Sequence, residues 1–258
     1  DLVENGLEYF QWADHFFGPG EELFSHIPLY PVPGNHENNS NYFFKYFHLP
    51  ENGSPGFNEH WWYHDYSNVR VIGLDSNGGF QISTQLNWLE NVLEESCIDD
   101  DVDFVFAQLH HPYKSELWIA GETDFTGDVI ALLENFSTAC EKPSIHFFGH
   151  THGYSRGQSR DHNHLWVNVA TAGGNIDYWD EYAQNDYDEF TVTHDEWGFV
   201  IVESIAGNDP FFTLKRISRG NENEFRDNEL RDEITIKKFN ESPLTPSYNY
   251  PNNETVSP

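Results

Sequence analysis

Three apolar segments of the chain each run directly into a polar loop, and this repeated arrangement strongly limits the folds open to it. Residues 69–74, 102–109 and 144–148 are rich in Val, Ile and Phe, which predicts buried strands. Amphipathic helical patterns at 83–95 and 127–140 separate these strands. Strands that alternate with helices predict a layered α/β domain whose sheet is partly parallel.

The two ends of the chain carry different patterns. Apolar residues at helical spacing predict a helix over 7–17, and Gly18-Pro19-Gly20 is expected to end it. Residues 27–32 are expected to form a strand that leads into a polar turn at 33–37. Near the other end, 199–205 and 211–217 predict antiparallel strands that complete the domain.

The loops after the predicted strands carry potential metal ligands. In α/β sheets the carboxyl ends of strands form the ligand-binding edge, so these side chains are expected to converge. They offer carboxylate, amide and imidazole groups without a thiolate, which favours Zn, Mn or Fe over a copper or iron–sulfur site. A single His at a strand end is usually an ordinary polar residue, but several on one edge favour a metal site. The candidate groups are Asp1, Asn35, His36, His110, His150 and His152.

The charge of the chain restricts its partners. It has 43 Asp and Glu against 13 Lys and Arg, a formal net charge of −30. Such a surface repels duplex nucleic acid, so no nucleic-acid duplex is expected as a partner. A phosphorylated substrate would need positive charge from metal ions. We also expect no membrane span, because no run approaches the ~18 apolar residues that a span needs.

The two cysteines, Cys97 and Cys140, lie too far apart for a metal-binding pair motif. The sequence leaves open whether they form a disulfide or stay as two buried thiols. The chain begins with Asp and contains no Met, so we expect a processed or fragmentary sequence. Five Asn-x-Ser/Thr sequons are weakly consistent with a secreted, periplasmic or extracellular location, which we take as our expectation.

Four motifs, in this order, resemble those of the calcineurin-like metallophosphoesterases, with the purple-acid-phosphatase-like enzymes as the nearest branch. They are Asp1-Leu2-Val3-Glu4-Asn5-Gly6, Gly34-Asn35-His36-Glu37, His110-His111-Pro112 and Gly149-His150-Thr151-His152. The resemblance implies two mixed β-sheets packed face to face and flanked by helices, without the first strands of the family fold. This domain is expected over 1–219. Residues 220–258 are expected to add a strand and a Pro/Asn-rich linker toward a further β-sandwich domain.

The resemblance also implies a site with two metal ions, either Fe, Zn or Mn. Asp1 would bridge both ions, Asn35, His110 and His150 would complete the second, and His152 would bind the first. His110 is preferred over His111 because the family ligand precedes a Pro by two positions. A carboxylate shared by two ions holds them together and lowers the pKa of a bridging water, which makes water the nucleophile.

The remaining polar residues of the motifs are expected to handle protons and substrate. His36 would act as general acid or stabilise the charged transition state. Glu4 would orient His36, although an ordinary surface carboxylate is an almost equal alternative. We expect Asn35, His111 and Tyr113 to contact the substrate.

Three departures from the family pattern limit the activity, the metal site and the substrates that we expect. The Asp-x-His motif that should precede Asp1 is absent, so this chain alone is expected to bind the first metal poorly and to be weakly active or inactive, whereas the full-length protein is expected to be an enzyme. Glu4 stands where purple acid phosphatases carry a metal-binding Tyr, which argues against a ferric–tyrosinate chromophore. Asn5 stands where protein phosphatases carry an Arg, which argues against a phosphoprotein substrate.

The sequence therefore predicts hydrolysis of phosphate monoesters or diesters of a small molecule or nucleotide. One alternative is a catalytically inactive secreted binding or surface module on the same scaffold. Another is a metallohydrolase for acyl substrates, which the Gly-Asn-His-Glu turn disfavours. Protein partners are not predicted.

Overall fold

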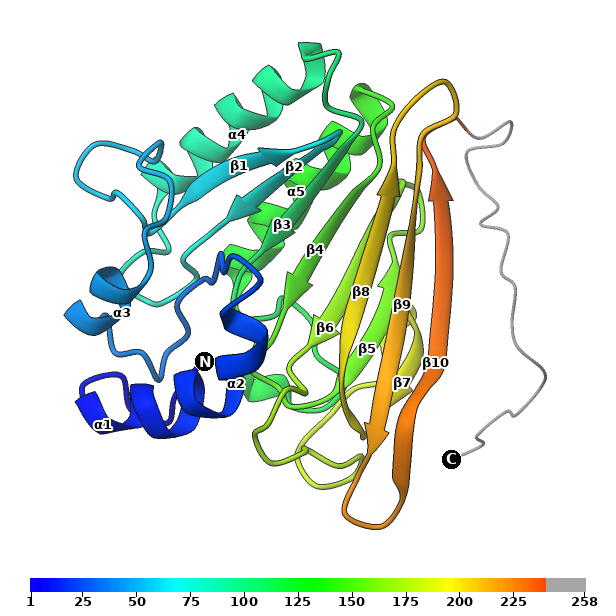
Figure 1. The fold of residues 1–258 in the computed structure, drawn as a ribbon. Coiled ribbons are helices and arrows are strands. Elements are labelled where there is room, and N and C mark those ends of the chain that lie inside the picture. The colour runs from blue at the N-terminus through cyan, green and yellow to red at the C-terminus, as the bar shows by residue number, and fades with distance from the viewer. Residues whose placement is uncertain (240–258) are drawn as a thin grey trace.

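Two β-sheets form the centre of the computed structural model, which describes residues 1–239 (Figure 1). The larger sheet has seven strands in the order β1 (Trp62–Tyr66), β2 (Val69–Gly73), β3 (Phe104–Gln108), β4 (Ser144–Phe148), β6 (His164–Val169), β5 (Tyr154–Gln158) and β7 (Phe190–His194). The smaller sheet is antiparallel, in the order β10 (Phe225–Lys237), β9 (Phe211–Gly220) and β8 (Trp197–Ile205). The linker expected at 240–258 lies outside the described residues.

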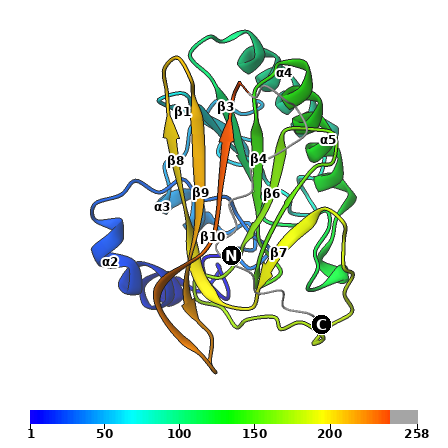
Figure 2. The same ribbon diagram turned by 90° about the vertical axis from the view of Figure 1, so that its right-hand side faces the viewer.

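Two long helices complete a three-layer arrangement. The helices α4 (Ser83–Ile98) and α5 (Asp124–Ala139) cover one face of the larger sheet, and the smaller sheet covers the other (Figure 2). The shorter helices are α1 (Tyr9–Gln11), the π-helix η1 (Trp12–Phe17), α2 (Gly18–Phe24), α3 (Asn41–Tyr46) and the 3-10 helix η2 (Ile119–Gly121). The predicted α/β fold of two face-to-face sheets with helices is confirmed. No helix within residues 1–239 is both long and apolar enough to cross a membrane.

Alternation along the central strands creates two apolar layers. On β3, Val105 packs toward the helices, where it meets Leu89 and Val129. Its neighbour Phe104 points to the opposite face and packs on Phe212 of the smaller sheet, with ring centroids 5.1 Å apart. Successive side chains of a strand point to opposite faces, so a strand covered on both sides is expected to be mainly apolar. The central strands accordingly appear in the sequence as mainly apolar runs, although β2 and β4 also contain buried polar side chains.

The strand directions bring the polar loops together. The strands β2, β3, β4 and β6 are parallel neighbours. Their carboxyl ends therefore lie along one edge of the sheet, and the N-terminus of the chain lies at the same edge (Figure 1). The convergence that the sequence predicted thus follows from parallel pairing.

Two local predictions are wrong. The helix predicted to end at Gly18-Pro19-Gly20 continues to Phe24 as α2. Pro19 lies in the first turn of α2, where its missing N–H needs no intrahelical partner. Residues 27–32 form no strand. This segment contains Pro28 and Pro31, and each removes a donor that a strand ladder requires.

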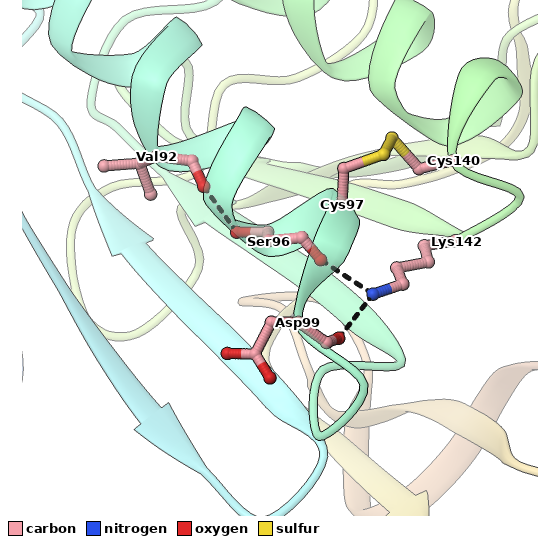
Figure 3. The surroundings of a disulfide bond; sticks show 6 residues. All are labelled: Val92, Ser96, Cys97, Asp99, Cys140 and Lys142. Atoms are coloured by element: carbon pink, nitrogen blue, oxygen red, sulfur yellow. Dashed lines mark hydrogen bonds between the residues drawn. A yellow bond between two sulfur atoms is a disulfide. The ribbon is translucent and has the colours of Figure 1, made fainter.

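A disulfide joins Cys97, near the end of α4, to Cys140, which directly follows α5 (Figure 3). The two cysteines therefore form a disulfide, which is one of the two alternatives that the sequence left open. Beside it, the Lys142 ammonium donates hydrogen bonds to the carbonyl oxygens of Ser96 and Asp99 at 2.7 and 2.6 Å. These interactions satisfy carbonyl groups at the end of α4 that have no partner within the helix. The disulfide lies at the end of the helical layer opposite to the carboxyl ends of β2, β3 and β4.

We expect the double variant Cys97→Ser, Cys140→Ser to fold but to lose about 2–4 kcal/mol of unfolding free energy, because the bond restricts the unfolded chain. Urea denaturation of the oxidised protein and of the variant measures this. Reducing agent should destabilise the natural chain and leave the variant unchanged. Equal stability of the two oxidised proteins would contradict the expectation.

Candidate metal centre

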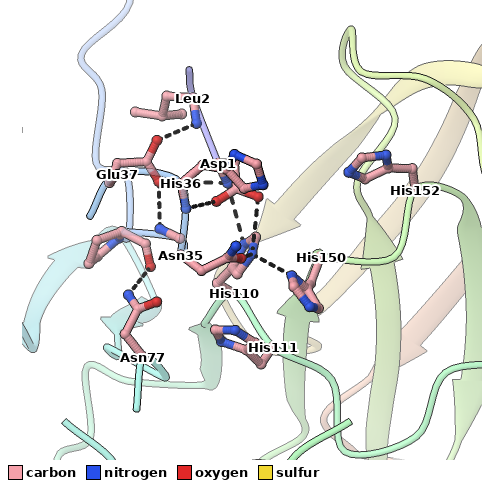
Figure 4. Close-up of polar contacts among 12 residues, drawn as sticks. Asp1, Leu2, Asn35, His36, Glu37, Asn77, His110, His111, His150 and His152 are labelled. Atoms are coloured by element: carbon pink, nitrogen blue, oxygen red, sulfur yellow. Dashed lines mark hydrogen bonds and ion pairs between the residues drawn. The ribbon is translucent and has the colours of Figure 1, made fainter. Parts of the chain in front are cut away.

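Three side chains converge on one nitrogen atom, Nε2 of His110 (Figure 4). Asn35 Oδ1 lies 2.8 Å from it, His150 Nδ1 lies 3.0 Å from it and Asp1 Oδ2 lies 3.2 Å from it. Four of the five predicted metal ligands therefore lie together, with His110 in contact with each of the other three. The fifth, His152, is not part of this group.

The arrangement of these four groups fits a metal ion. His110 Nε2 carries at most one hydrogen, so it cannot satisfy all three neighbouring atoms by hydrogen bonding. Whichever tautomers the two imidazoles adopt, lone pairs of neighbouring atoms are left facing Nε2 at short range, which is unfavourable without a cation between them. Cis ligands at about 2.1 Å from one ion lie about 3 Å apart, which is the spacing seen here. The carboxylate, amide and imidazole groups suit Zn, Mn or Fe.

The electrostatic environment keeps the imidazoles in the form that a metal requires. Burial lowers the pKa of His110 well below its usual value. Burial, aided by the neighbouring imidazoles, lowers the pKa of His150 to about 4. Both rings are neutral at neutral pH, so a metal ion would not have to displace a proton from them. His150 also has a positive φ of 70°, in the region that favours glycine, so its backbone is held in an uncommon conformation.

A buried carboxylate fixes the position of Asp1. The Glu37 side chain is 0% exposed, and its two oxygens accept hydrogen bonds from the main-chain N–H groups of Leu2 at 2.7 Å and Gly34 at 2.6 Å. Asp1 Oδ1 in turn accepts the main-chain N–H of His36 at 2.9 Å. Glu37 thus holds the segments that carry Asp1 and Asn35 against each other. No role for Glu37 was predicted, since its burial is not visible in the sequence of a polar turn.

The loop after β2 positions the two adjacent histidines of the next strand end. Ser76 Oγ accepts the main-chain N–H groups of His110 and His111 at 3.1 and 2.8 Å. Asp75, which is 1% exposed, contacts His60 Nδ1 at 2.8 Å and accepts the main-chain N–H of Asn77 at 3.0 Å. The sequence predicted this loop but gave none of these residues a role at the site, and the only available signal was its position at a strand end.

His36 lies beside the group and is partly exposed. Its Nδ1 is 2.6 Å from the main-chain oxygen of Glu4, and a carbonyl can only accept, so Nδ1 is the donor. Glu4 therefore orients His36 through its backbone and not, as predicted, through its carboxylate. That carboxylate is exposed and makes no hydrogen bond within residues 1–239. A main-chain contact of this kind does not depend on the residue type at position 4.

Two predicted site residues lie apart from the group. The main-chain N–H of His152 donates to Asp177 Oδ2 at 2.7 Å, and its side chain lies on the far side of His150 from Asp1 (Figure 4). The ring of Tyr113 packs against Gly127 and lies 6.3 Å from the ring of Trp166, in the apolar cluster beneath α5. Tyr113 is only partly buried, so its predicted substrate contact stays a prediction. His111, in contrast, does lie with His110 and His150, with ring nitrogens within 4.8 Å.

The 112–126 loop and the 173–187 loop meet beside His150. The ring of Trp118 lies 5.2 Å from that of His150, and the N–H of Ile119 donates to the Ala183 carbonyl at 3.0 Å. Glu116, in the first of these loops, accepts a hydrogen bond from the Thr193 hydroxyl of β7. Burial raises the pKa of Glu116 to about 7. The first loop is thus hydrogen-bonded both to β7 of the larger sheet and to the second loop.

The calcineurin-like phosphoesterase family model matches residues 1–154, which include all four motifs. The chain belongs to the calcineurin-like phosphoesterase family. No curated protein sequence matches it significantly. The resemblance inferred from the motifs is therefore confirmed at the level of the family.

Solved structures with this phosphoesterase fold show how widely its sequences vary. GAP50, the anchor in the inner membrane complex of Plasmodium, is 13% identical with a TM-score of 0.55, over 90% of this chain and 76% of that chain. Purple acid phosphatase PPD1 from yellow lupin seeds is 15% identical with a TM-score of 0.51, over 79% of this chain and 37% of that chain. The chain thus spans well under half the length of the lupin protein. At these identities the similarity establishes the fold.

We expect Gly34→Ala to weaken metal binding by about 10- to 100-fold, because an added Cβ would lie 2.1 Å from Asp1 Oδ1 and displace that carboxylate. Titration calorimetry with Zn²⁺ or Mn²⁺ measures the affinity. Gly78→Ala is the matched control, since a Cβ there meets no atom within 4 Å. Unchanged affinity in the Gly34 variant would show that Asp1 is not a ligand.

We expect the stability of the protein to carry a pH dependence from Glu116. Its folded pKa is raised from 4.5 to about 7, so its stabilising contribution is present below pH 4.5 and is lost as the pH rises through 7. Glu116→Gln should therefore be stabilising at pH 8 relative to pH 5, by an amount on the order of 3 kcal/mol. Urea denaturation at both pH values measures this, with the exposed Glu222→Gln as control. A variant effect independent of pH would refute the assignment.

Proposed function

We propose that this chain is a metal-dependent phosphoester hydrolase of the calcineurin-like type. The observation that carries the proposal is the convergence of Asp1, Asn35 and His150 on His110 Nε2 within 3.2 Å. Side chains that leave lone pairs unsatisfied at such short range are suited to a cation. The family in which these motifs occur acts on phosphate esters.

The four groups would hold one ion, and each has a distinct part in the site. A bound divalent cation supplies Lewis acidity for a phosphoryl oxygen and for the attacking water. Asp1 contributes negative charge, and Asn35 and the two imidazoles contribute neutral donors. Glu37 keeps Asp1 in place. A second ion, with His152 as ligand, is part of the proposal on the basis of the family motifs.

His36 is the proposed proton donor for the leaving oxygen. Its Nδ1 is committed to the Glu4 carbonyl, which leaves Nε2 as the edge of the ring that is free for the substrate. As imidazolium it would stabilise the charged transition state, and it would then protonate the departing group. No Ser or Cys nucleophile is needed, since water attacks.

The proposed substrate is a small phosphate ester, either a monoester or a diester. With a net charge of −30, the surface does not steer anions to the site, so affinity must come from contacts at short range. Trp118 and the 46% exposed Tyr182, whose ring centroids lie 6.3 Å apart, offer apolar faces beside His150. These faces favour esters that carry a planar or nucleoside group.

We also propose that the protein works in an oxidising compartment, either outside the cell or in a periplasm. The Cys97–Cys140 disulfide supports this location, since such bonds persist mainly in oxidising surroundings.

The alternative is a binding or surface module that does not catalyse. GAP50, which shares the fold, is an anchor protein, so the scaffold is compatible with a structural role. The position of His152 is the observation that favours this alternative, because its side chain lies apart from Asp1, on the far side of His150 (Figure 4).

One assay separates the two. The protein is tested with Mn²⁺, Zn²⁺ and Fe²⁺ on p-nitrophenyl phosphate and bis-p-nitrophenyl phosphate. We expect metal-dependent hydrolysis, with kcat lowered about 10²- to 10⁴-fold by His36→Ala while metal binding is kept. His110→Ala should lose metal binding and activity together.

The exposed His26→Ala variant is the control and should behave as the natural protein. Metal binding without hydrolysis of either ester would favour the module. Hydrolysis that His36→Ala does not affect would remove His36 from the mechanism.

A further inference from the structure

The hydroxyl of Ser76 lies at the junction of two site loops and makes three polar contacts. The residue is 0% exposed. Its oxygen is 3.1 Å from the main-chain nitrogen of His110, 2.8 Å from the main-chain nitrogen of His111 and 3.0 Å from the ring nitrogen Nδ1 of His111. Each contact lies within hydrogen-bond distance, so the direction of each can be worked out.

The chemistry of a hydroxyl leaves one assignment. A serine oxygen offers two lone pairs and one hydrogen. The two main-chain N–H groups can only donate, so they occupy both lone pairs. The hydroxyl hydrogen must then go to His111 Nδ1, because this oxygen has no other acceptor in reach within residues 1–239. Nδ1 therefore accepts, and the ring carries its hydrogen on Nε2.

We propose that Ser76 fixes His111 as an Nε2–H donor, so that His111 binds an anionic oxygen of the substrate and does not ligate the metal. This inference rests on the proposed phosphoester hydrolysis, in which the oxygen belongs to the phosphoryl group. His111 Nε2 has no hydrogen-bond partner within residues 1–239, so its N–H is available. His111 would thereby provide the hydrogen-bond donor to the phosphoryl oxygen that Lys or Arg often provides in other proteins.

Proximity alone would suggest a different role. The ring nitrogens of His110, His111 and His150 lie within 4.8 Å of one another, as in a three-histidine metal site. The hydrogen bonding distinguishes them. His110 Nε2 faces an amide oxygen, an imidazole nitrogen and a carboxylate, whereas His111 Nδ1 is turned to the Ser76 hydroxyl. A ring nitrogen that carries a hydrogen has no lone pair for a metal.

Nitrogen NMR of the protein with ¹⁵N-labelled histidine tests the assignment without any substrate. In metal-free protein at pH 8, long-range ¹H–¹⁵N correlations distinguish the two tautomers. We expect His111 to carry its hydrogen on Nε2 alone. Ser76→Ala should produce a mixture of tautomers, and the exposed Ser83→Ala should not. Should Ser76→Ala fail to fold, the natural protein's spectrum decides alone, and a hydrogen on Nδ1 of His111 would overturn the proposal.

Metal and substrate measurements test the consequence. His111→Ala should keep its affinity for Zn²⁺ or Mn²⁺ in calorimetry, whereas His110→Ala should lose it. On bis-p-nitrophenyl phosphate, we expect His111→Ala to lower kcat/KM about 10- to 100-fold, and His111→Gln, whose amide places an N–H near Nε2, to recover most of it.

Loss of metal affinity in His111→Ala equal to that in His110→Ala would overturn the inference, as would an Asn substitution that rescues better than Gln. If no variant and no natural protein hydrolyses any ester, the proposed function fails. The tautomer and metal measurements would still confirm or refute the role of Ser76.

Discussion

The short contacts around His110 Nε2 are the constraint on which the rest of the site depends. Three atoms with lone pairs lie within 3.2 Å of a nitrogen that has one hydrogen to offer. Neighbouring residues must therefore hold these atoms in place. Glu37 holds one side through main-chain N–H groups, and Ser76 holds the other in the same way. Glu37 and Ser76 contact main-chain groups and not the side chains of the ligands, and in this way they fix the positions of the ligands.

Much of the fold could be predicted because its central strands are covered on both faces. The strands β2, β3 and β4 appear as apolar runs, and the intervening helices force parallel pairing. The strands β1, β5 and β7 were not predicted, since their residues show no long apolar run and no clear alternation. Glycine and proline misled the prediction near the N-terminus. Pro19 was taken as a stop, although the first turn of a helix accepts it.

The candidate site was predictable to the extent that its residues occur in ordered motifs. Asp1, Asn35, His110 and His150 were assigned in this way and lie in contact. Glu37 and Ser76 were missed because they act through burial and main-chain hydrogen bonds, for which the sequence has no pattern. Tyr113 lies apart from these four residues and packs against the apolar cluster under α5, and its predicted substrate contact stays a prediction. The assignment of His152 as a ligand stays a prediction.

The disulfide and the histidine group occupy opposite rims of the same layered body, because α4 and α5 begin near the ligand loops and end at the cystine. The disulfide and the candidate metal ligands are thereby separated by the full length of α4 and α5. Reduction of the cystine would therefore loosen the far ends of α4 and α5 and leave the contacts around His110 in place.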